Sequence, residues 1–181
     1  TPQNVYLNTV ASLYFYMGGY SDSQGSQGSY RGGYDLNTFT TDEAMLPTRG
    51  GDWYDGGFWL GLFLHKWGSN RDAIKATWEY LYKVIVVSNQ SLEILGELRQ
   101  KTDYNDLDRY EAEVRAFRAM YYYYLVDMFG RVPHIVSSSI PVKDVRQSDR
   151  KEVFDFVVKE LQESLLLLST ALSNSPGDYY G

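Results

Sequence analysis

The sequence predicts a mainly α-helical protein, built on a helical hairpin and carrying a long irregular loop region near its N-terminus. In residues 69–100 and again in 106–129, large apolar residues recur at steps of three and four, which is the period of one helix face. A short polar turn joins these stretches, so the two helices should run antiparallel. Residues 18–38 have no such period and are rich in Gly, Ser and Gln, which is typical of a loop.

The N-terminal part should contain one helix followed by two loops of different character. Residues 3–17 have a loose apolar face that ends at Gly18-Gly19. The Gly/Ser-rich loop of residues 18–38 is long for a folded domain, which leaves open a plain surface loop or a loop that contacts a ligand. Residues 39–67 hold three of the four tryptophans.

Glycine pairs at 50–51 and 56–57 flank Trp53. Because glycine permits tight turns, the backbone should bend on both sides and push Trp53 and Tyr54 outward. The residues expected to pack onto the helices are Trp59, Leu60, Phe63 and Trp67. His65 is expected to be packed or hydrogen-bonded.

The helix of residues 69–100 should be capped by Ser69 or Asn70 and weakened near Gly96. Its expected inner face comprises Ile74, Trp78, Leu81, Tyr82, Ile85, Asn89 and Leu92. The second helix should be covered on more than one side, because four consecutive tyrosines widen its apolar stripe. That stripe is expected at Tyr110, Val114, Phe117, Tyr121, Tyr124 or Leu125, and Met128. Gly130 and Pro133 mark its end. Such a hairpin is similar to a tetratricopeptide (TPR) repeat, although the strict W-x-x-L-G-x-x-Y signature is absent.

Residues 134–147 read as a connector whose β-branched residues should form short extended pieces. Asp149 followed by Glu152 has the form of a capping box, so a helix should begin there and run to residue 172. Its apolar face is expected at Phe154, Val157, Leu161, Leu165, Leu168 and Leu172. Because only one hairpin is available to cover this face, part of it should be exposed.

Composition excludes several kinds of site. A net charge of −6 and a pI of about 4.9 disfavour binding to nucleic-acid phosphates. The absence of cysteine excludes disulfides and thiolate metal sites, and no apolar run approaches the roughly 18–20 residues that span a bilayer. His65 and His134 lack a ligand spacing. The acidic stretch 103–108 lacks the glycine and glutamate of a calcium loop, so we expect a turn and an N-cap there, with no metal and no cofactor.

Three segments of the chain resemble the SusD/RagB family of outer-membrane nutrient-binding lipoproteins. Residues 113–133 follow E-x-x-x-x-R-A-x-x-Y-Y-x-L-V-x-x-F-G-x-V-P, residues 39–67 contain an Asp-Glu pair, a D-W-x-x-G cluster and a final H-x-W, and residues 146–154 read RQSDRKEVF. The resemblance implies a TPR-like scaffold, a surface-exposed position at the outer membrane through a lipid anchor, and delivery of ligand to a SusC-like TonB-dependent transporter. This chain has no cysteine to carry the lipid.

The resemblance also implies a domain organisation, because members of this family are several times longer. Residues 1–181 should form a single domain that is a truncated N-terminal part of a longer protein. Within it we expect an N-terminal helix with loops in 1–67, the hairpin in 68–133, and a connector with a leucine-rich helix in 134–181.

The leading hypothesis is a non-catalytic subunit that binds a glycan or another nutrient. Sugar rings have apolar C–H faces that can lie on aromatic planes, while their hydroxyls need fixed hydrogen-bonding partners. Trp53 and Tyr54 could supply the plane. The full set of candidate ligand-binding residues is Arg49, Asp52, Trp53, Tyr54, Asp55 and Trp59.

Other interpretations remain open. Trp53 and Trp59 could simply wedge the loop onto the helices, and the whole chain could be a TPR-like scaffold for protein–protein interaction. A glycoside hydrolase fragment would need two carboxyl groups facing each other across a cleft, drawn from Asp42, Glu43, Asp52 and Asp55. No nucleophile-elbow or H-E-x-x-H motif is present, so we expect no enzyme.

Overall fold

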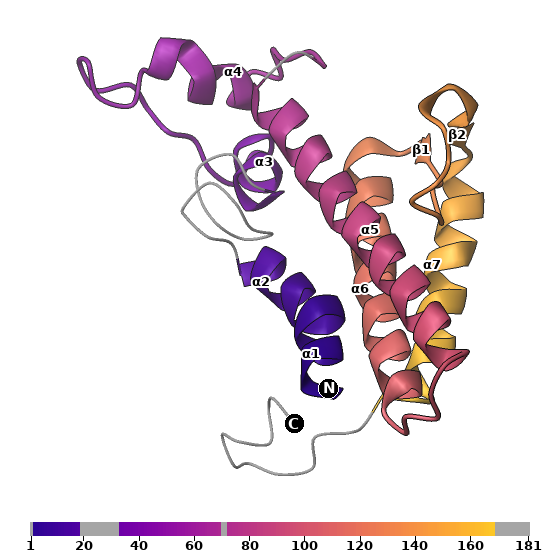
Figure 1. Cartoon of the computed structure of the whole chain (residues 1–181). Coiled ribbons are helices and arrows are strands. Elements are labelled where there is room, and N and C mark those ends of the chain that lie inside the picture. The colour runs from indigo at the N-terminus through magenta and orange to yellow at the C-terminus, as the bar shows by residue number, and fades with distance from the viewer. Residues whose placement is uncertain (1, 19–32, 70–71, 169–181) are drawn as a thin grey trace. The chain divides into compact units, whose positions relative to one another are not determined.

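The computed structural model describes residues 2–18, 33–69 and 72–168, and most of these are helical (Figure 1). The elements in chain order are α1 (Pro2–Tyr6), the π-helix η1 (Leu7–Ala11), α2 (Ser12–Gly18), α3 (Gly33–Phe39), the 3₁₀ turn η2 (Asp55–Gly57), α4 (Phe58–Phe63), α5 (Asp72–Arg99), α6 (Leu107–Phe129), β1 (Val132–Pro133), the 3₁₀ turn η3 (Val142–Asp144), β2 (Gln147–Ser148) and α7 (Arg150–Leu165). The predicted mainly α, TPR-like class is confirmed.

The chain divides into two compact units. The first, here called the hairpin unit, comprises Thr1–Val10 and Val86–Gly181, and the second, the loop unit, comprises Ala11–Ile85. The boundary at Ile85 lies within α5, so this helix contributes one half to each unit. The expectation of a single domain stays a prediction.

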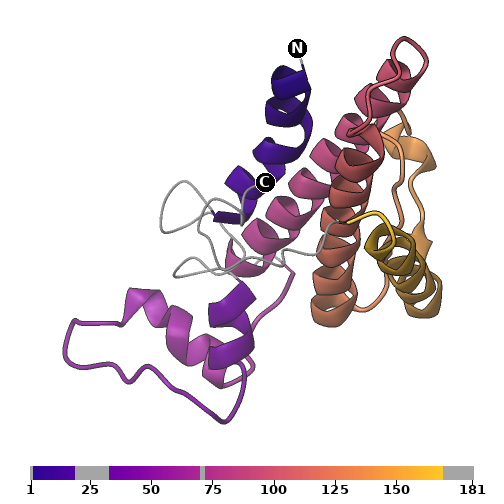
Figure 2. The same cartoon turned by 90° about the horizontal axis from the view of Figure 1, so that it is seen from below.

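Helix α6 is the centre of the hairpin unit and lies between the second half of α5 and α7 (Figures 1 and 2). The predicted stripe is buried at Tyr110, Val114, Phe117, Tyr121 and Leu125. Leu125 is therefore the core residue and Tyr124 is only half-buried. Because Ala119 and Tyr122 are also buried, the helix is covered on more than one side, as its run of tyrosines predicts.

A buried network of charges ties α6 to α7 and α5. Two guanidinium groups of α6 reach Glu160 of α7: Arg115 Nη2 donates to Oε1 at 2.7 Å, and Arg118 Nη2 donates to Oε2 at 2.7 Å. Arg118 Nη1 also donates to Asn89 Oδ1 of α5 at 2.9 Å. Burial by itself would raise the pKa of Glu160, but the hydrogen bonds from Arg115 and Arg118 outweigh it and hold that pKa below its ordinary value.

The connector after α6 is fastened at Ile135. Tyr122 Oη donates to the Ile135 carbonyl at 2.7 Å and accepts from the Ile135 N–H at 2.6 Å. Asn89 Nδ2 donates to the same carbonyl at 3.0 Å. Burial raises the pKa of Tyr122 to about 12, so this hydroxyl keeps its proton under ordinary conditions.

The extended pieces of the connector occur at its two ends. β1 and β2 pair antiparallel, with Val132 opposite Ser148 and Pro133 opposite Gln147. The β-branched positions on which the sequence prediction rested, such as Ile140 and Val142, lie outside both strands.

Helix α7 begins where the sequence predicts, but its cap and its buried face differ from the prediction. Asp149 occupies the N-cap position, yet among the described residues its side chain makes no capping hydrogen bond; it pairs with Arg131 Nη2 at 3.1 Å. The capping-box prediction was therefore wrong. The helix ends at Leu165, and the predicted extension to residue 172 lies partly outside the described residues.

The face of α7 that contacts α6 is not the one with the largest apolar side chains. Its buried residues are Val153, Val157, Glu160 and Ser164, whereas Phe154, Leu161 and Leu165 are exposed. The expectation of a partly exposed apolar face is confirmed. Of the six positions predicted for that face, Val157 is buried.

The helix predicted for residues 3–17 is confirmed, with one irregular turn. α1, η1 and α2 follow one another without a break from Pro2 to Gly18, and η1 is a π-helix. In the hairpin unit, the Thr9 carbonyl in this turn accepts a hydrogen bond from Ser91 Oγ of α5 at 3.0 Å. The rings of Tyr6 and Tyr110 lie 5.2 Å apart, so α1 also packs on α6.

The predicted loop of residues 18–38 is wrong over its last part, because residues 33–39 form α3 with Leu36 buried. Residues 19–32 lie outside the described part of the chain. α5 runs through Gly96 to Arg99, so this glycine does not end it. Asn70 lies outside the described residues, which leaves the predicted cap untested. None of the helices within the described residues has both the length and the apolar character needed to cross a bilayer.

Replacing Glu160 with alanine should lower the free energy of unfolding by about 3 kcal/mol, because the buried Arg118 would lose its charged partner and the half-buried Arg115 would keep only Glu163. Since the pKa of Glu160 is lowered in the fold, its contribution is present above the ordinary value of 4.5 and lost as the pH falls through the folded pKa. Urea unfolding at several pH values should therefore show the difference from wild type shrinking in acid. Glu163→Ala, which removes a more exposed partner of Arg115, should cost less than about 1 kcal/mol. Equal losses in both variants would contradict this account.

Tyr122→Phe should destabilise the chain by about 1–3 kcal/mol, because both backbone groups of Ile135 would lose a partner while the ring stays in place. Tyr123→Phe changes the next residue, which is exposed, and should have little effect. Urea unfolding of the two variants side by side measures the difference, and similar stabilities would show that the Tyr122 hydroxyl contributes nothing.

Candidate functional site

The aromatic loop, defined here as residues 41–57, connects α3 to α4 within the loop unit and is held at its base. His65 Nε2, just beyond α4, donates to the Thr40 carbonyl, just beyond α3, at 2.8 Å. The rings of Phe39 and Trp59 lie 5.1 Å apart at 73°. The expectation of a hydrogen-bonded His65 is confirmed. Two contacts between the ends of α3 and α4 therefore fix where the loop begins and ends.

Trp59 is the buried support of the aromatic loop. Only 3% of this residue is exposed, and its ring also meets Phe58 edge-on at 4.9 Å. Its indole Nε1 donates to Asp55 Oδ2 at 2.8 Å. A buried tryptophan N–H usually finds an acceptor, and here the loop itself supplies it.

The tip of the loop is a series of tight turns. The backbones of Arg49 and Asp52 exchange hydrogen bonds of 3.2 and 3.0 Å around Gly50-Gly51. Trp53 and Asp55 then adopt the left-handed region with φ of 57° and 40°. A side chain in this region costs about 1–2 kcal/mol, so the surrounding contacts must hold these two residues there.

This backbone leaves Trp53 and Tyr54 each 55% exposed, as the flanking glycines predict. The Trp53 ring rests on the edge of Trp59, with the ring centres 6.4 Å apart at 66°. The aromatic loop therefore presents the rings of Trp53 and Tyr54 to solvent, and the ring of Trp53 contacts the buried ring of Trp59. Chemically, it offers a flat apolar surface edged by polar groups.

The six candidate residues fall into three pairs. Trp53 and Tyr54 are exposed, Arg49 and Asp52 flank a turn with exposed side chains, and Asp55 and Trp59 bind each other. Their role in ligand binding stays a prediction. For Trp59, burial favours support of the loop over direct contact.

Two residues predicted to pack on the helices are largely exposed, although the ring of Trp67 lies 5.1 Å from that of His65. Leu60 and Trp67 are exposed, while Phe58 and Leu62 are buried in their place and Phe63 is half-buried. The supporting residues Phe39 and Thr40 had no signal in the sequence, because the helix that positions them was not expected.

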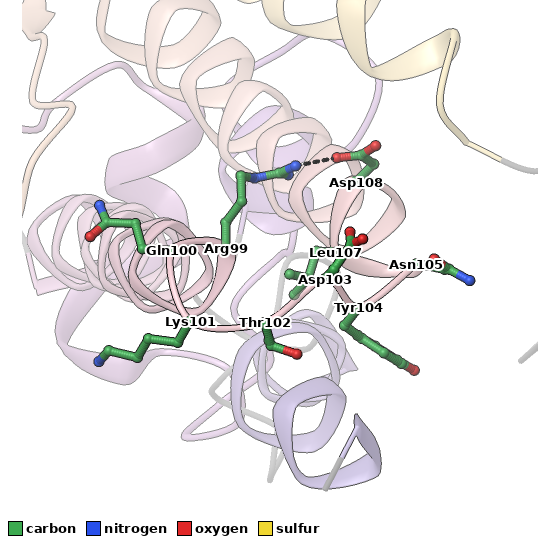
Figure 3. A pocket seen from close by; sticks show the side chains of 9 residues that line it. All are labelled: Arg99, Gln100, Lys101, Thr102, Asp103, Tyr104, Asn105, Leu107 and Asp108. Atoms are coloured by element: carbon green, nitrogen blue, oxygen red, sulfur yellow. Dashed lines mark hydrogen bonds and ion pairs between the residues drawn. The ribbon is translucent and has the colours of Figure 1, made fainter.

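A polar hollow of about 530 Å³ lies at the turn between α5 and α6 in the hairpin unit (Figure 3). Its lining is partly engaged, since Arg99 pairs with Asp108 at 2.6 Å and with Glu111 at 2.8 Å. Tyr104 Oη lies 3.4 Å from Tyr110 Oη and donates to Asp106 Oδ2 at 2.7 Å, and these bonds raise the pKa of Tyr104.

The same turn was expected to form an N-cap and no metal site. Asp106 does take the N-cap position of α6, but its carboxylate makes no capping hydrogen bond within the described residues. Across the described ranges, no group of three or more His, Cys, Asp or Glu side chains is placed to hold a metal ion.

The family of the chain follows from its match to known sequences. Residues 21–177 match the SusD-like family described as "Starch-binding associating with outer membrane". The chain belongs to this SusD-like family. The resemblance inferred from three short segments is thereby confirmed, and it extends over most of the chain.

Individual relatives support this assignment. SusD-like protein P2 of Formosa agariphila is 28% identical over 52% of this chain and 19% of its own length. The starch-binding protein SusD of Bacteroides thetaiotaomicron is 25% identical over 77% of this chain and 23% of its own. A solved laminarin-binding SusD-like protein covers 95% of this chain with a TM-score of 0.73 at 24% identity, which shows a common fold. The chain spans about a fifth of the curated relatives' length and 35% of that structure.

Gly57→Ala should lower the melting temperature by about 2–4 °C, since φ is 78° at this residue and a side chain there costs about 1 kcal/mol. No atom lies within 4 Å of the added Cβ, so the cost is conformational. Gly51→Ala is the matched control: its Cβ also meets open space and its φ is not in the left-handed region. Thermal unfolding with equal midpoints for both variants would contradict the assigned backbone.

Proposed function

We propose that this chain is part of a non-catalytic cell-surface subunit that binds glycans and passes them to a SusC-like TonB-dependent outer-membrane transporter. The observation that carries the proposal is the exposed Trp53–Tyr54 pair, held on a buried tryptophan in a chain of the SusD-like family. The family description names starch binding and association with the outer membrane. The transporter and a lipid anchor are inferred from the family alone.

The chemistry of the loop supports binding of a sugar. An exposed indole held in one orientation can accept the C–H face of a pyranose without reorganising, so little conformational entropy is lost on binding. Arg49 and Asp52 lie beside the platform in sequence and have exposed polar groups for hydroxyls. A hydrolytic role is less well supported, because Asp55 already accepts the Trp59 indole N–H.

A protein-interaction role is the second candidate, and the exposed face of α7 favours it. An apolar hollow of about 430 Å³ lies between α6 and α7 in the hairpin unit. Its lining residues are Tyr123, Val126, Asp127, Arg150, Lys151 and Phe154. Apolar surface of this kind often marks a contact with other protein segments. It belongs to a different unit from the aromatic loop, so the two roles can be tested separately.

Isothermal titration calorimetry with starch-derived and laminarin-derived oligosaccharides tests the glycan role. Trp53→Ala should weaken binding at least about tenfold, which corresponds to ~1.4 kcal/mol, because the exposed plane is lost. Calorimetry is preferred over fluorescence because the substitution removes one of the fluorophores. The titrations are made on this chain and on the longest natural protein that contains it.

Phe154→Ala is the matched control, since Phe154 is also a large exposed aromatic residue and belongs to the hairpin unit. It should bind as the wild type does. An unchanged dissociation constant in Trp53→Ala, or an equal loss in Phe154→Ala, would remove the aromatic loop as the glycan site.

A further inference from the structure

We propose that Asp55 is a positioning residue for ligand binding: by holding Trp59 it fixes the exposed ring of Trp53, and it does not itself contact the ligand. This inference rests on the proposed glycan-binding role of the aromatic loop. Asp52 and Asp55, two acidic residues of the same loop, then have different tasks.

Asp55 and Trp59 are joined by a hydrogen bond. An indole has a single N–H and no acceptor, and Trp59 uses it on Asp55 Oδ2 at 2.8 Å. Trp59 is the second residue of α4 and Asp55 lies in the turn before this helix, so the bond ties the loop to the helix that follows. Because the acceptor is charged, this hydrogen bond is stronger than one between neutral groups.

The ring of Trp59 is fixed by the rings packed against it. Its ring is surrounded by Phe39 of α3, at 5.1 Å, and by Phe58, at 4.9 Å. A side chain that is buried among rings on two elements cannot turn without displacing them. The bond from Asp55 therefore anchors the loop to a fixed point.

The ring of Trp59 in turn contacts the ring of Trp53. The rings of Trp53 and Trp59 meet at a steep angle of 66°, with their centres 6.4 Å apart, and Trp53 remains 55% exposed. Its backbone and that of Asp55 both take left-handed angles, and Gly56 and Gly57 follow, where a Cβ would meet no atom within 4 Å. If the carboxylate of Asp55 were removed, these residues would be free to relax, and the ring of Trp53 would no longer be held in one orientation.

Asp52 and Asp55 are both exposed, and they differ in what their side chains bind. Asp55 Oδ2 accepts the Trp59 indole N–H, whereas the hydrogen bonds described for Asp52 are those of its backbone with Arg49. We therefore assign the Asp52 carboxylate to sugar hydroxyls and the Asp55 carboxylate to support of the platform.

The test compares substitutions by oligosaccharide titration in the calorimeter. Asp55→Ala and Trp59→Phe each remove one side of the bond and should weaken binding about tenfold. Asp55→Asn keeps a carbonyl oxygen that can accept the indole N–H, so it should stay within about threefold of wild type. A charged ligand contact at Asp55 would instead make Asp55→Asn as weak as Asp55→Ala and overturn the proposal.

A double substitution separates positioning from contact. If Asp55 acts through Trp53, then Asp55→Ala should add less than about twofold to the loss already caused by Trp53→Ala, because coupled residues are not additive. A full additional loss would show a direct contact and overturn the inference. The Trp59 indole N–H resonance in ¹⁵N-labelled protein should shift in Asp55→Ala and return close to its wild-type position in Asp55→Asn. An unmoved resonance in Asp55→Ala would show that the bond is absent in solution.

The two proposals fail differently. If Trp53→Ala leaves the affinity unchanged, the glycan role of the loop fails and the positioning role fails with it. If Trp53→Ala weakens binding while Asp55→Ala does not, the glycan role stands and the positioning inference alone is overturned.

Discussion

The carboxylate of Glu160 serves two guanidinium groups of α6 at once, and the packing of the hairpin unit depends on it. Charges inside a protein are stable only when paired and hydrogen-bonded, so α7 must keep Glu160 within reach of Arg115 and Arg118. Arg118 extends the requirement to α5 through Asn89, and Asn89 continues to the Ile135 carbonyl. One continuous polar path thus sets the register of three helices and of the connector, while apolar side chains fill the space around it.

The aromatic loop keeps the large ring of Trp53 outside the core and still in one orientation. Burial of a large apolar side chain such as that of Trp53 is normally favourable. Here the left-handed backbone at Trp53 and Asp55 accompanies an exposed Trp53 side chain, and the buried Trp59 supports its ring. Non-glycine residues held in left-handed backbone cluster at active sites and ligand clamps.

Much of the hairpin could be predicted because its helices are long, so that many residues report the same period. Tyr110, Val114, Phe117 and Tyr121 all lie on the predicted face. α3 was missed because it has seven residues beside a Gly-rich stretch and its buried residues are Asp35 and Leu36; a helix this short depends on tertiary contacts. On α7, large leucines suggested the contact face, but the need of two arginines for a carboxylate placed Glu160 there.

The candidate site shows the same division between local and distant signals. Glycines on both sides of Trp53 are local, and they correctly predicted an outward ring. The bond between Asp55 and Trp59 depends on the turn conformation, and the pairing of Asp149 with Arg131 depends on how the connector folds back. Neither contact can be obtained from spacing alone, so the sequence predicted a cap at Asp149 and could not predict the bond between Asp55 and Trp59.

The π-helix of residues Leu7–Ala11 has a consequence for comparing this chain with its relatives. A π turn accommodates one more residue than an α turn, and each residue of an α-helix advances by about 100°. A relative with a regular helix here would therefore carry one residue fewer. An alignment without a gap at this turn would match buried positions on one side of it with exposed positions on the other. The Thr9 carbonyl in this turn accepts a hydrogen bond from Ser91, so a deletion that made the helix regular would shift a residue that fastens this helix to α5.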